Sequence, residues 1–199
     1  KIKVWPNWVD TSEFSPPSIS DEGRDGVLFV GRLSDQKNLF LLLDAIAGTG
    51  QLLTVVGDGE CATAIQERAR TLNVYVEFRG SIANNLLPAL YRRCAVYVIC
   101  SHYEGHPKTL LEAMACGCAV VGTDVPGIRE IVAHEQNGLL VTEDSAALRA
   151  ALGRLLGDKE LRRELGDAAR KSVAQEYSLE SAVAAECKTY DELLGSGET

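Results

Sequence analysis

The sequence predicts an α/β protein built on a doubly wound parallel sheet, and three observations support that fold class. Short apolar runs alternate with segments of helical spacing about five times between residues 26 and 141. The runs are rich in Val, Ile and Leu and do not alternate with polar residues, as is typical of parallel strands covered on both faces. Of the 199 residues, 46% are hydrophobic and 24% are charged, which is close to globular averages.

The elements follow in order from these patterns. Residues 1–10 are expected to form a short apolar strand, and residues 11–26, rich in Ser, Pro and charge, a loop. The compact apolar runs predict strands at residues 26–31, 52–56, 74–78, 95–100, 119–122 and 138–141. Helical spacing predicts helices at residues 38–47, 61–72, 86–94, 107–116 and 128–132. After Asp144 the pattern is helical, with a break at residues 177–178 and a last helix at 179–194.

The charge balance limits the partners of the chain. The net charge is −8, from 20 Lys and Arg against 28 Asp and Glu. A broad basic surface for nucleic acid or anionic membrane is therefore not expected, and an anion site must be built locally. The start of the chain lacks the pattern of a signal peptide, and the longest apolar stretch, residues 39–56, is interrupted by Asp44 and by Gly48 and Gly50.

The six cysteines allow two interpretations, disulfides or reduced and mostly buried thiols. Most of them lie in apolar runs of a chain large enough to fold without cross-links, so reduced thiols are expected. They are Cys61, Cys94, Cys100, Cys116, Cys118 and Cys187.

Ligands of doubly wound sheets bind at the carboxyl ends of the strands, so the loops there are the candidate sites. Gly31 follows the first strand and allows close approach to the backbone. Arg32 and Lys37 on the same loop form a candidate diphosphate clamp, the alternative being two solvated cations.

The loop after the second strand formally fits a dinucleotide-binding pattern. Gly57, Gly59 and Ala62 match G-x-G-x-x-G/A, and Glu77 lies at a suitable distance to hold a ribose. A tight turn that requires glycine explains the same residues equally well.

The loop and helix after the fourth strand carry a stronger signal. Pro107 is expected at the first helical position and His106 at the N-cap, where histidine caps poorly. Together with Gly105, this arrangement predicts free N–H groups that attract an anion, the alternative being capping by water. Glu112, inside the helix, is a candidate for holding ribose hydroxyls or, alternatively, a solvated helix carboxylate. Cys100 crowds with the nearby histidines, but Gly105 and Pro107 disfavour a helical zinc site.

At this point the residues resemble a known family. Residues 104–117 are similar to the E-x7-E signature of retaining glycosyltransferases of the GT-B fold, family GT4. Residues 30–37, 57–59, 76–80 and 127–141 also match in family order. The resemblance implies a single Rossmann-like domain that corresponds to the C-terminal, donor-binding half of a two-domain enzyme.

The resemblance implies roles for individual residues. The catalytic residues would be Arg32 and Lys37, which bind the donor diphosphate, and Glu104, beside the donor sugar. The other donor-binding positions would be Gly31, Gly57, Gly59, Ile82, Asn84, Gly105, His106, Pro107, Thr109, Leu110, Leu111 and Glu112. Within this set the backbone N–H groups of Thr109, Leu110 and Leu111 would meet phosphate, Glu112 the ribose, and Ile82 and Asn84 the base. His106 stands where the family often has Phe, and Ala119 where it usually has Pro.

The resemblance also implies an organisation and a function. Residues 1–26 would be an entry strand and linker, 27–177 the nucleotide-sugar-binding domain, and 178–199 a crossing helix and tail. The expected activity is a hexosyltransferase-like transfer, with retention, in polysaccharide biosynthesis. The acceptor would lie on a missing N-terminal domain, so this part alone would be inactive. No metal or cofactor is expected beyond the nucleotide sugar. The expected location is cytoplasmic, with any membrane contact at the inner face made through the missing half.

Three alternatives stay open at this point. The pattern at Gly57 and Gly59 allows an NAD-binding domain of an oxidoreductase. A GT-B sugar epimerase and a non-catalytic nucleotide-sugar sensor would share the same donor site.

Overall fold

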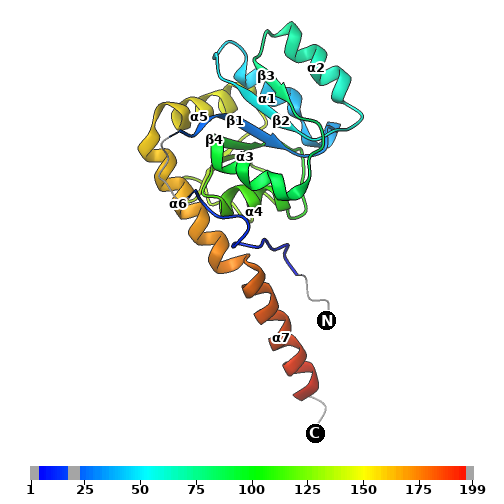
Figure 1. Cartoon of the computed structure of the whole chain (residues 1–199), viewed down its shortest axis with the longest axis vertical. Helices are drawn as coiled ribbons and strands as arrows, with labels where there is room; N and C mark the ends of the chain where they lie inside the picture. Colours follow the sequence, from blue (N-terminus) through cyan, green and yellow to red (C-terminus); the bar gives the residue numbers. More distant parts are fainter. Residues whose placement is uncertain (1–4, 18–22, 196–199) are drawn as a thin grey trace.

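The computed structural model describes residues 5–17 and 23–195, and its centre is a six-stranded sheet in which all paired strands run parallel (Figure 1). The strands are β1 Asp25–Val30, β2 Leu53–Val56, β3 Val76–Phe78, β4 Cys94–Ile99, β5 Ala119–Thr123 and β6 Leu139–Val141. Their order is β3-β2-β1-β4-β5-β6, so the winding reverses between β1 and β4. The predicted fold class and the six strands from residue 26 onward are confirmed.

The register aligns the carboxyl ends of the central strands. Val30 of β1 lies opposite Val56 of β2, and Leu28 lies opposite Tyr97 of β4. The loops after β1, β2 and β4 therefore leave the sheet at one edge. Because the winding reverses beside β1, this edge is where a doubly wound sheet opens a crevice for a ligand.

Helices cover both faces of the sheet. One face carries α1 Leu39–Ile46, α2 Ala62–Thr71 and α5 Ser145–Gly157, and the other carries α3 Leu87–Arg93, α4 Lys108–Ala115 and α6 Lys159–Glu176. Along β1, the side chains of Val27 and Phe29 pack on the first face and those of Leu28 and Val30 on the second. Burial on both faces explains why the strand sequences are continuously apolar.

One expected element is wrong in the structure, and a second is not formed in the part of it that the structure describes. Residues 128–132 form hydrogen-bonded turns and not a helix, since a single turn after Gly127 is too short to propagate one. The strand expected over residues 1–10 lies partly outside the described residues. In its described part only Val9 pairs, in an isolated parallel bridge with Ser178, because Pro6 has no N–H to donate and a turn begins after Asp10.

The described N-terminal segment is held against the second face of the sheet. The Phe14 side chain is buried, and the Arg170 guanidinium donates to the carbonyl oxygens of Phe14 and Thr11, both at 3.0 Å. Val9 N–H donates to the Tyr177 carbonyl at 2.9 Å, at the break between α6 and the last helix. This segment therefore runs beside the point where the chain leaves the domain.

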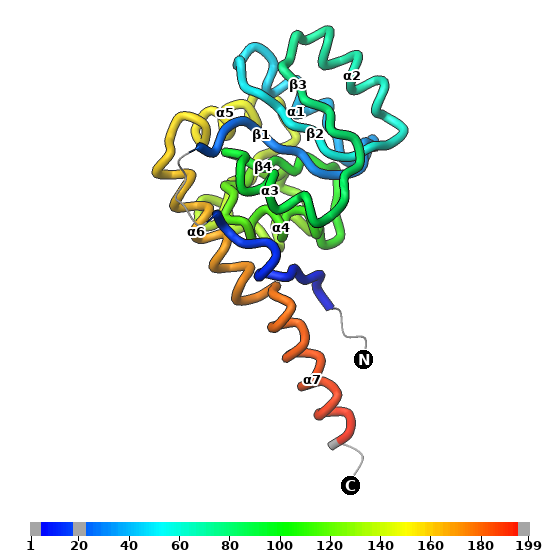
Figure 2. The backbone as a smooth tube through the Cα atoms, in the orientation of Figure 1, coloured from blue at the N-terminus to red at the C-terminus, as the bar shows by residue number. Residues whose placement is uncertain are grey.

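The last helix, α7 Leu179–Gly195, extends away from the sheet as a long arm (Figures 1 and 2). Its position confirms the predicted helix after the break at residues 177–178. Among the described residues, no helix combines the length and the apolar character needed to cross a bilayer.

The cysteines are reduced thiols in the structure, in agreement with the interpretation from the sequence. Cys94, Cys100, Cys116 and Cys118 are buried, Cys61 is half-buried and Cys187 is exposed. Burial raises the pKa of the Cys100 thiol to about 12, so this group stays protonated and unreactive at neutral pH.

Candidate functional site

The loops after β1 and β4 meet at the edge where the winding reverses. The backbone N–H of His102 donates to the Gln36 carbonyl, and Gln36 Nε2 donates to the Tyr103 carbonyl, both at 2.9 Å. The Cys100 thiol lies 3.3 Å from the Lys37 carbonyl oxygen. A short 3-10 helix, η1 Asp35–Lys37, shapes the first loop. Hydrogen bonds thus join the two loops into one unit. It carries the residues predicted from the sequence, the cations Arg32 and Lys37 and the carboxylate Glu104.

Lys37 and Glu104 form an ion pair inside this unit. Lys37 Nζ lies 2.5 Å from Glu104 Oε1, and the Glu104 side chain is only 7% exposed. Ser101 Oγ donates to the same oxygen at 2.6 Å. Thr123 Oγ1, at the end of β5, donates to the Ser101 carbonyl at 2.6 Å. Ser101 and Thr123 were not predicted, and the only signal for Ser101 was its position three residues before Glu104.

Arg32 is an exposed cation of the site. Within the described residues it makes no ion pair, so its guanidinium is available to an incoming anion. An open hollow of about 630 Å³ lies beside it. The hollow is lined by Arg32, Ser34, Asp35, Gln36, Lys37, Glu60, His102 and Tyr103.

The N-terminus of α4 begins one residue later than the sequence predicts. Pro107 is the N-cap, with extended backbone (φ −71°, ψ 113°) and no side-chain cap, so placing His106 at the N-cap and Pro107 inside the helix was wrong. The ψ of Pro107 is extended and not helical, so the helix starts only at the next residue, Lys108. Leu111 N–H already donates to the Pro107 carbonyl at 3.4 Å. In the described part of the chain the open donors are therefore the N–H groups of residues 108–110, which include Thr109 and Leu110 but not Leu111.

Lys108 adds a cation that the sequence patterns did not indicate. Its Nζ lies 5.2 Å from the centroid of the Trp8 ring, within reach of a cation–π interaction. It is the first residue of α4, beside the open N–H groups. The sequence could not reveal this contact, because Trp8 and Lys108 are far apart along the chain.

The glycines of the site fall into two kinds. Gly57 has φ +130°, and a Cβ there would lie 1.9 Å from the Gly31 carbonyl oxygen. A Cβ on Gly59 would lie 2.5 Å from the Leu33 carbonyl oxygen. These two glycines let the loop after β2 pack on the loop after β1. Gly31 and Gly105, by contrast, have ordinary φ values, and a Cβ on either would meet no atom closer than 3.4 Å, so packing does not explain them.

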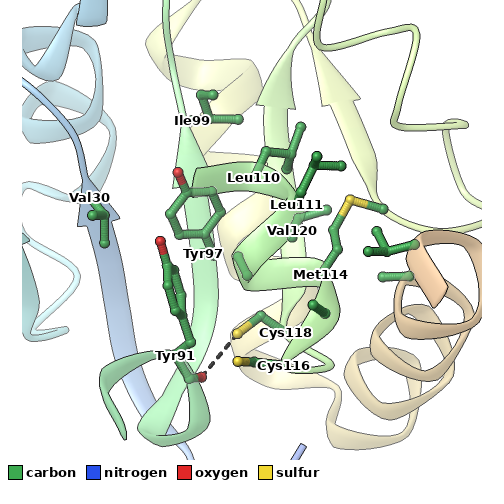
Figure 3. Packing of buried hydrophobic residues seen from close by; sticks show 14 of the residues in the cluster. Val30, Tyr91, Tyr97, Ile99, Leu110, Leu111, Met114, Cys116, Cys118 and Val120 are labelled. Atoms are coloured by element: carbon green, nitrogen blue, oxygen red, sulfur yellow. Dashed lines mark hydrogen bonds between the residues drawn. The ribbon is translucent and has the colours of Figure 1, made fainter. Parts of the chain in front are cut away.

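Glu112 is a buried carboxylate and not a solvated one. It is 3% exposed, and its Oε2 accepts a hydrogen bond from the Tyr91 hydroxyl at 3.0 Å. Burial raises its pKa, since the charged form is poorly solvated there. The Tyr91 ring packs edge-on against Tyr97, and Tyr97 donates to Thr109 Oγ1 at 2.9 Å. Figure 3 shows both rings with their hydroxyl groups directed toward the end of the sheet at which Val30 lies.

The two residues expected near a base are less closely tied to the site. Ile82 is partly buried and packs against the core on the second face of the sheet. Asn84 opens a short 3-10 helix, η2 Asn84–Leu86, and is exposed. Neither side chain contacts the loops after β1 and β4 through a hydrogen bond in the part of the chain that the structure describes, so their role stays a prediction.

The dinucleotide and zinc interpretations do not gain support. The G-x-G loop follows β2, one strand away from the point where the winding reverses, and Glu77 is paired with Arg79 at 2.9 Å. The candidate zinc ligands have separate partners. His102 Nδ1 lies 2.5 Å from Glu143 Oε2, whereas the His106 ring lies 5.2 Å from the ring of Tyr177.

His106 links the site to the terminal segments. Its carbonyl accepts a hydrogen bond from Asn7 Nδ2 at 2.5 Å, and its ring packs on Tyr177. Burial lowers the pKa of His106, although the charge of Glu130 opposes the shift. The ring is therefore neutral at neutral pH. Protonation would place a charge in a partly buried position, which costs free energy.

The lowered pKa of His106 predicts an acid-sensitive fold. As the pH decreases through the ordinary histidine pKa of about 6.5, the unfolded chain takes up a proton more readily than the folded chain. The free energy of unfolding therefore decreases as the pH decreases. His106→Phe keeps a ring and cannot be protonated, so we expect a smaller loss of stability between pH 7.5 and pH 5.5. Urea unfolding of both proteins at the two pH values measures this, and equal losses would contradict it.

Comparisons with known proteins place the chain in a family. The family model for glycosyl transferases group 1 matches residues 10–172. The chain is 31% identical over 179 residues to the GalNAc-alpha-(1->4)-GalNAc-alpha-(1->3)-diNAcBac-PP-undecaprenol alpha-1,4-N-acetyl-D-galactosaminyltransferase of Campylobacter jejuni, covering 86% of this chain and 49% of that protein. It is 33% identical over 183 residues to a GDP-mannose-dependent alpha-mannosyltransferase of Mycolicibacterium smegmatis, covering 87% and 47%.

The solved structures agree with the sequence relatives. The crystal structure of the C-terminal domain of a glycosyl transferase group 1 family protein from Francisella tularensis superposes with a TM-score of 0.75 at 25% identity. The match covers 86% of this chain and 99% of that domain. The chain spans about half the length of the curated relatives it matches. Its sheet is that of GT-B C-terminal domains, and the chain belongs to the group 1 glycosyl transferases.

Proposed function

We propose that this domain binds the nucleotide-sugar donor of a retaining glycosyltransferase of family GT4. The observation that carries the proposal is that Arg32 and Lys37 follow β1 and the open N–H groups of α4 follow β4, the two strands between which the winding reverses. Two phosphates carry charge that such a set of cations and dipoles attracts. The membership of the chain in the group 1 family supports a sugar nucleotide over other phosphate ligands.

Each part of the donor has a candidate partner. The diphosphate would lie between Arg32, Lys37 and the start of α4. The glycines that packing does not explain, Gly31 and Gly105, would let it approach the backbone. Glu112 would accept hydrogen bonds from the ribose, and Glu104 from the sugar. The base would lie toward Ile82 and Asn84, beyond the loop that contains Gly57.

The proposed reaction breaks the bond between the anomeric carbon and the phosphate oxygen and forms a bond to an acceptor oxygen on the same face of the sugar. The departing nucleoside diphosphate gains negative charge, which Arg32, Lys37 and the N-terminus of α4 would stabilise. The proton of the acceptor hydroxyl would pass to that leaving group. In this proposal the protein's own cations neutralise the leaving group, and a metal ion is assigned no step.

The acceptor would be bound by a second domain outside this chain. Val183, Tyr190 and Leu194 are exposed on α7 at a spacing that places them on one face of the helix. A hollow of about 470 Å³ lies between the N-terminal segment and α7, lined in part by Trp5 and Trp8. We propose that these apolar surfaces contact the acceptor domain. The complete enzyme would act in polysaccharide biosynthesis in the cytoplasm. If its acceptor is lipid-linked, it would act at the inner face of the membrane.

Calorimetric titration with UDP, GDP and ADP tests the donor site. At least one nucleotide is expected to bind, and Arg32→Ala is expected to weaken it about 10- to 100-fold, the loss of a charge-assisted contact to phosphate. Arg70→Ala is the matched control, because Arg70 is an exposed arginine in the last turn of α2. Equal effects of both variants, or preferential binding of NADH, would contradict the proposed site.

A further inference from the structure

We propose that Ser101 is a positioning residue that holds the Glu104 carboxylate in place for the donor sugar. The inference rests on the proposed function, because it assigns the sugar to Glu104. It concerns a side chain that neither the family match nor the sequence pattern singles out.

The hydrogen bonds of Glu104 are distributed unevenly over its two oxygens. Lys37 Nζ and Ser101 Oγ both bind Oε1, at 2.5 Å and 2.6 Å. Within the described residues Oε2 receives no hydrogen bond and no ion pair. One oxygen is thus fixed by the protein, and the other is left to accept a hydroxyl group of a ligand.

The environment of Ser101 fits this role. The residue is fully buried two positions after the end of β4, where a hydroxyl without a partner would be costly. Its hydroxyl has one partner among the described residues, Glu104. Its carbonyl is held by Thr123 Oγ1 from the neighbouring strand β5. The backbone of Ser101 is therefore tied to β5 just beyond the end of β4, which holds in place the residue whose hydroxyl donates to Glu104.

Once the donor is bound, the Ser101 hydroxyl would be the main group that holds the Glu104 carboxylate. Lys37 is the cation that would turn toward the diphosphate, and its attraction for Glu104 would then be shared with the phosphates. Ser101 is buried and uncharged, so the phosphates do not attract its hydroxyl as they attract an ammonium group, and it can keep Oε1 fixed after Lys37 has moved. The carboxylate would otherwise be free to rotate when the sugar arrives.

The test compares two ligands on the same protein. Calorimetry measures Kd for a nucleoside diphosphate and for the matching nucleotide sugar, using UDP with UDP-glucose, GDP with GDP-mannose and ADP with ADP-glucose. Ser101→Ala is expected to change Kd for the nucleoside diphosphate by less than about twofold and to weaken the nucleotide sugar about 3- to 10-fold, the range of one lost hydrogen bond. A role limited to folding would change both constants together.

Further variants separate the role of the Ser101 hydroxyl from other effects of the substitution. Ser12→Ala removes a serine-to-carboxylate hydrogen bond of the same length, 2.6 Å to Asp10 Oδ1, away from the site, and is expected to change neither constant. In a Glu104→Ala background, Ser101→Ala is expected to have no further effect on the ratio of the two constants. Ser101→Cys retains the approximate volume and a weak donor, and replaces Ser101→Ala in the test if that variant does not fold. Its ratio of the two dissociation constants is expected to lie between those of wild type and a variant without the donor.

The possible failures are distinguishable. If no nucleoside diphosphate binds, the proposed function fails and this inference fails with it. If nucleotides bind and Ser101→Ala leaves the ratio unchanged, or lowers both affinities equally, only the role of Ser101 is overturned.

Discussion

Replacing Glu112 with glutamine is expected to weaken the binding of a nucleoside diphosphate about 10- to 100-fold, because a hydrogen bond to a charged acceptor is lost. The same change is expected to raise the free energy of unfolding at neutral pH. The wild-type carboxylate is buried beside the Tyr91 hydroxyl without a cation in hydrogen-bond contact within the described residues. Glutamine keeps an oxygen for Tyr91 and removes the buried charge.

The sign of the stability effect follows from the raised pKa of Glu112. Between its unfolded and folded pKa values, the folded chain binds the proton more readily, so stability falls as the pH rises through this window. Above the folded pKa the full cost is present, which is why glutamine is expected to be stabilising at pH 7. The advantage should shrink as the pH falls through the raised pKa.

Urea unfolding of wild type and Glu112→Gln at several pH values, with calorimetry at pH 7, measures both effects. Glu180→Gln on α7 is the matched control, because Glu180 is exposed on the arm and away from the site. Unchanged nucleotide affinity would contradict the ribose assignment. If Glu112→Gln is less stable than wild type at pH 7, the hydrogen bond from Tyr91 to the charged carboxylate stabilises the fold by more than the burial of that charge costs.

The fold could be predicted because its signals are local. The central strands are short apolar runs, and their burial on both faces of the sheet makes that pattern clear, whereas the edge strand β3 contains Glu77 and is only partly buried. The expected helix at 128–132 failed because apolar spacing over five residues does not distinguish a helix from successive turns around Gly127.

The candidate site could be predicted only in part. That the loops carrying Arg32, Lys37 and Glu104 lie at one edge could be predicted, because loops at the carboxyl ends of parallel strands leave the sheet together. The roles of these residues in donor binding stay predictions. The contact between Trp8 and Lys108 was missed because it joins residues 100 positions apart. The Ser101 hydroxyl was missed because a buried serine has no distinctive sequence pattern, and its contact with Glu104 appears only once the loop is folded.

Gly57 offers the prediction with the largest effect on stability. Gly57→Ala is expected to lower the free energy of unfolding by about 2–6 kcal/mol, the sum of backbone strain and overpacking. The backbone has φ +130°, a region that side chains other than glycine rarely adopt. The new methyl group would also lie 1.9 Å from the carbonyl oxygen of Gly31 and 2.9 Å from its carbon, and neither backbone atom can rotate away.

Gly105→Ala is the matched control for Gly57→Ala. A Cβ at Gly105 meets no atom within 4 Å and φ is ordinary, so its free energy of unfolding is expected to stay within about 0.5 kcal/mol of wild type. Urea unfolding followed by circular dichroism measures both variants, and equal stabilities would show that the loop after β2 can yield. If Gly105→Ala folds normally and binds a nucleotide sugar more weakly, its missing side chain serves the ligand. Gly57 serves the packing of the loop that carries Arg32, so the two glycines separate the requirements of binding from those of folding.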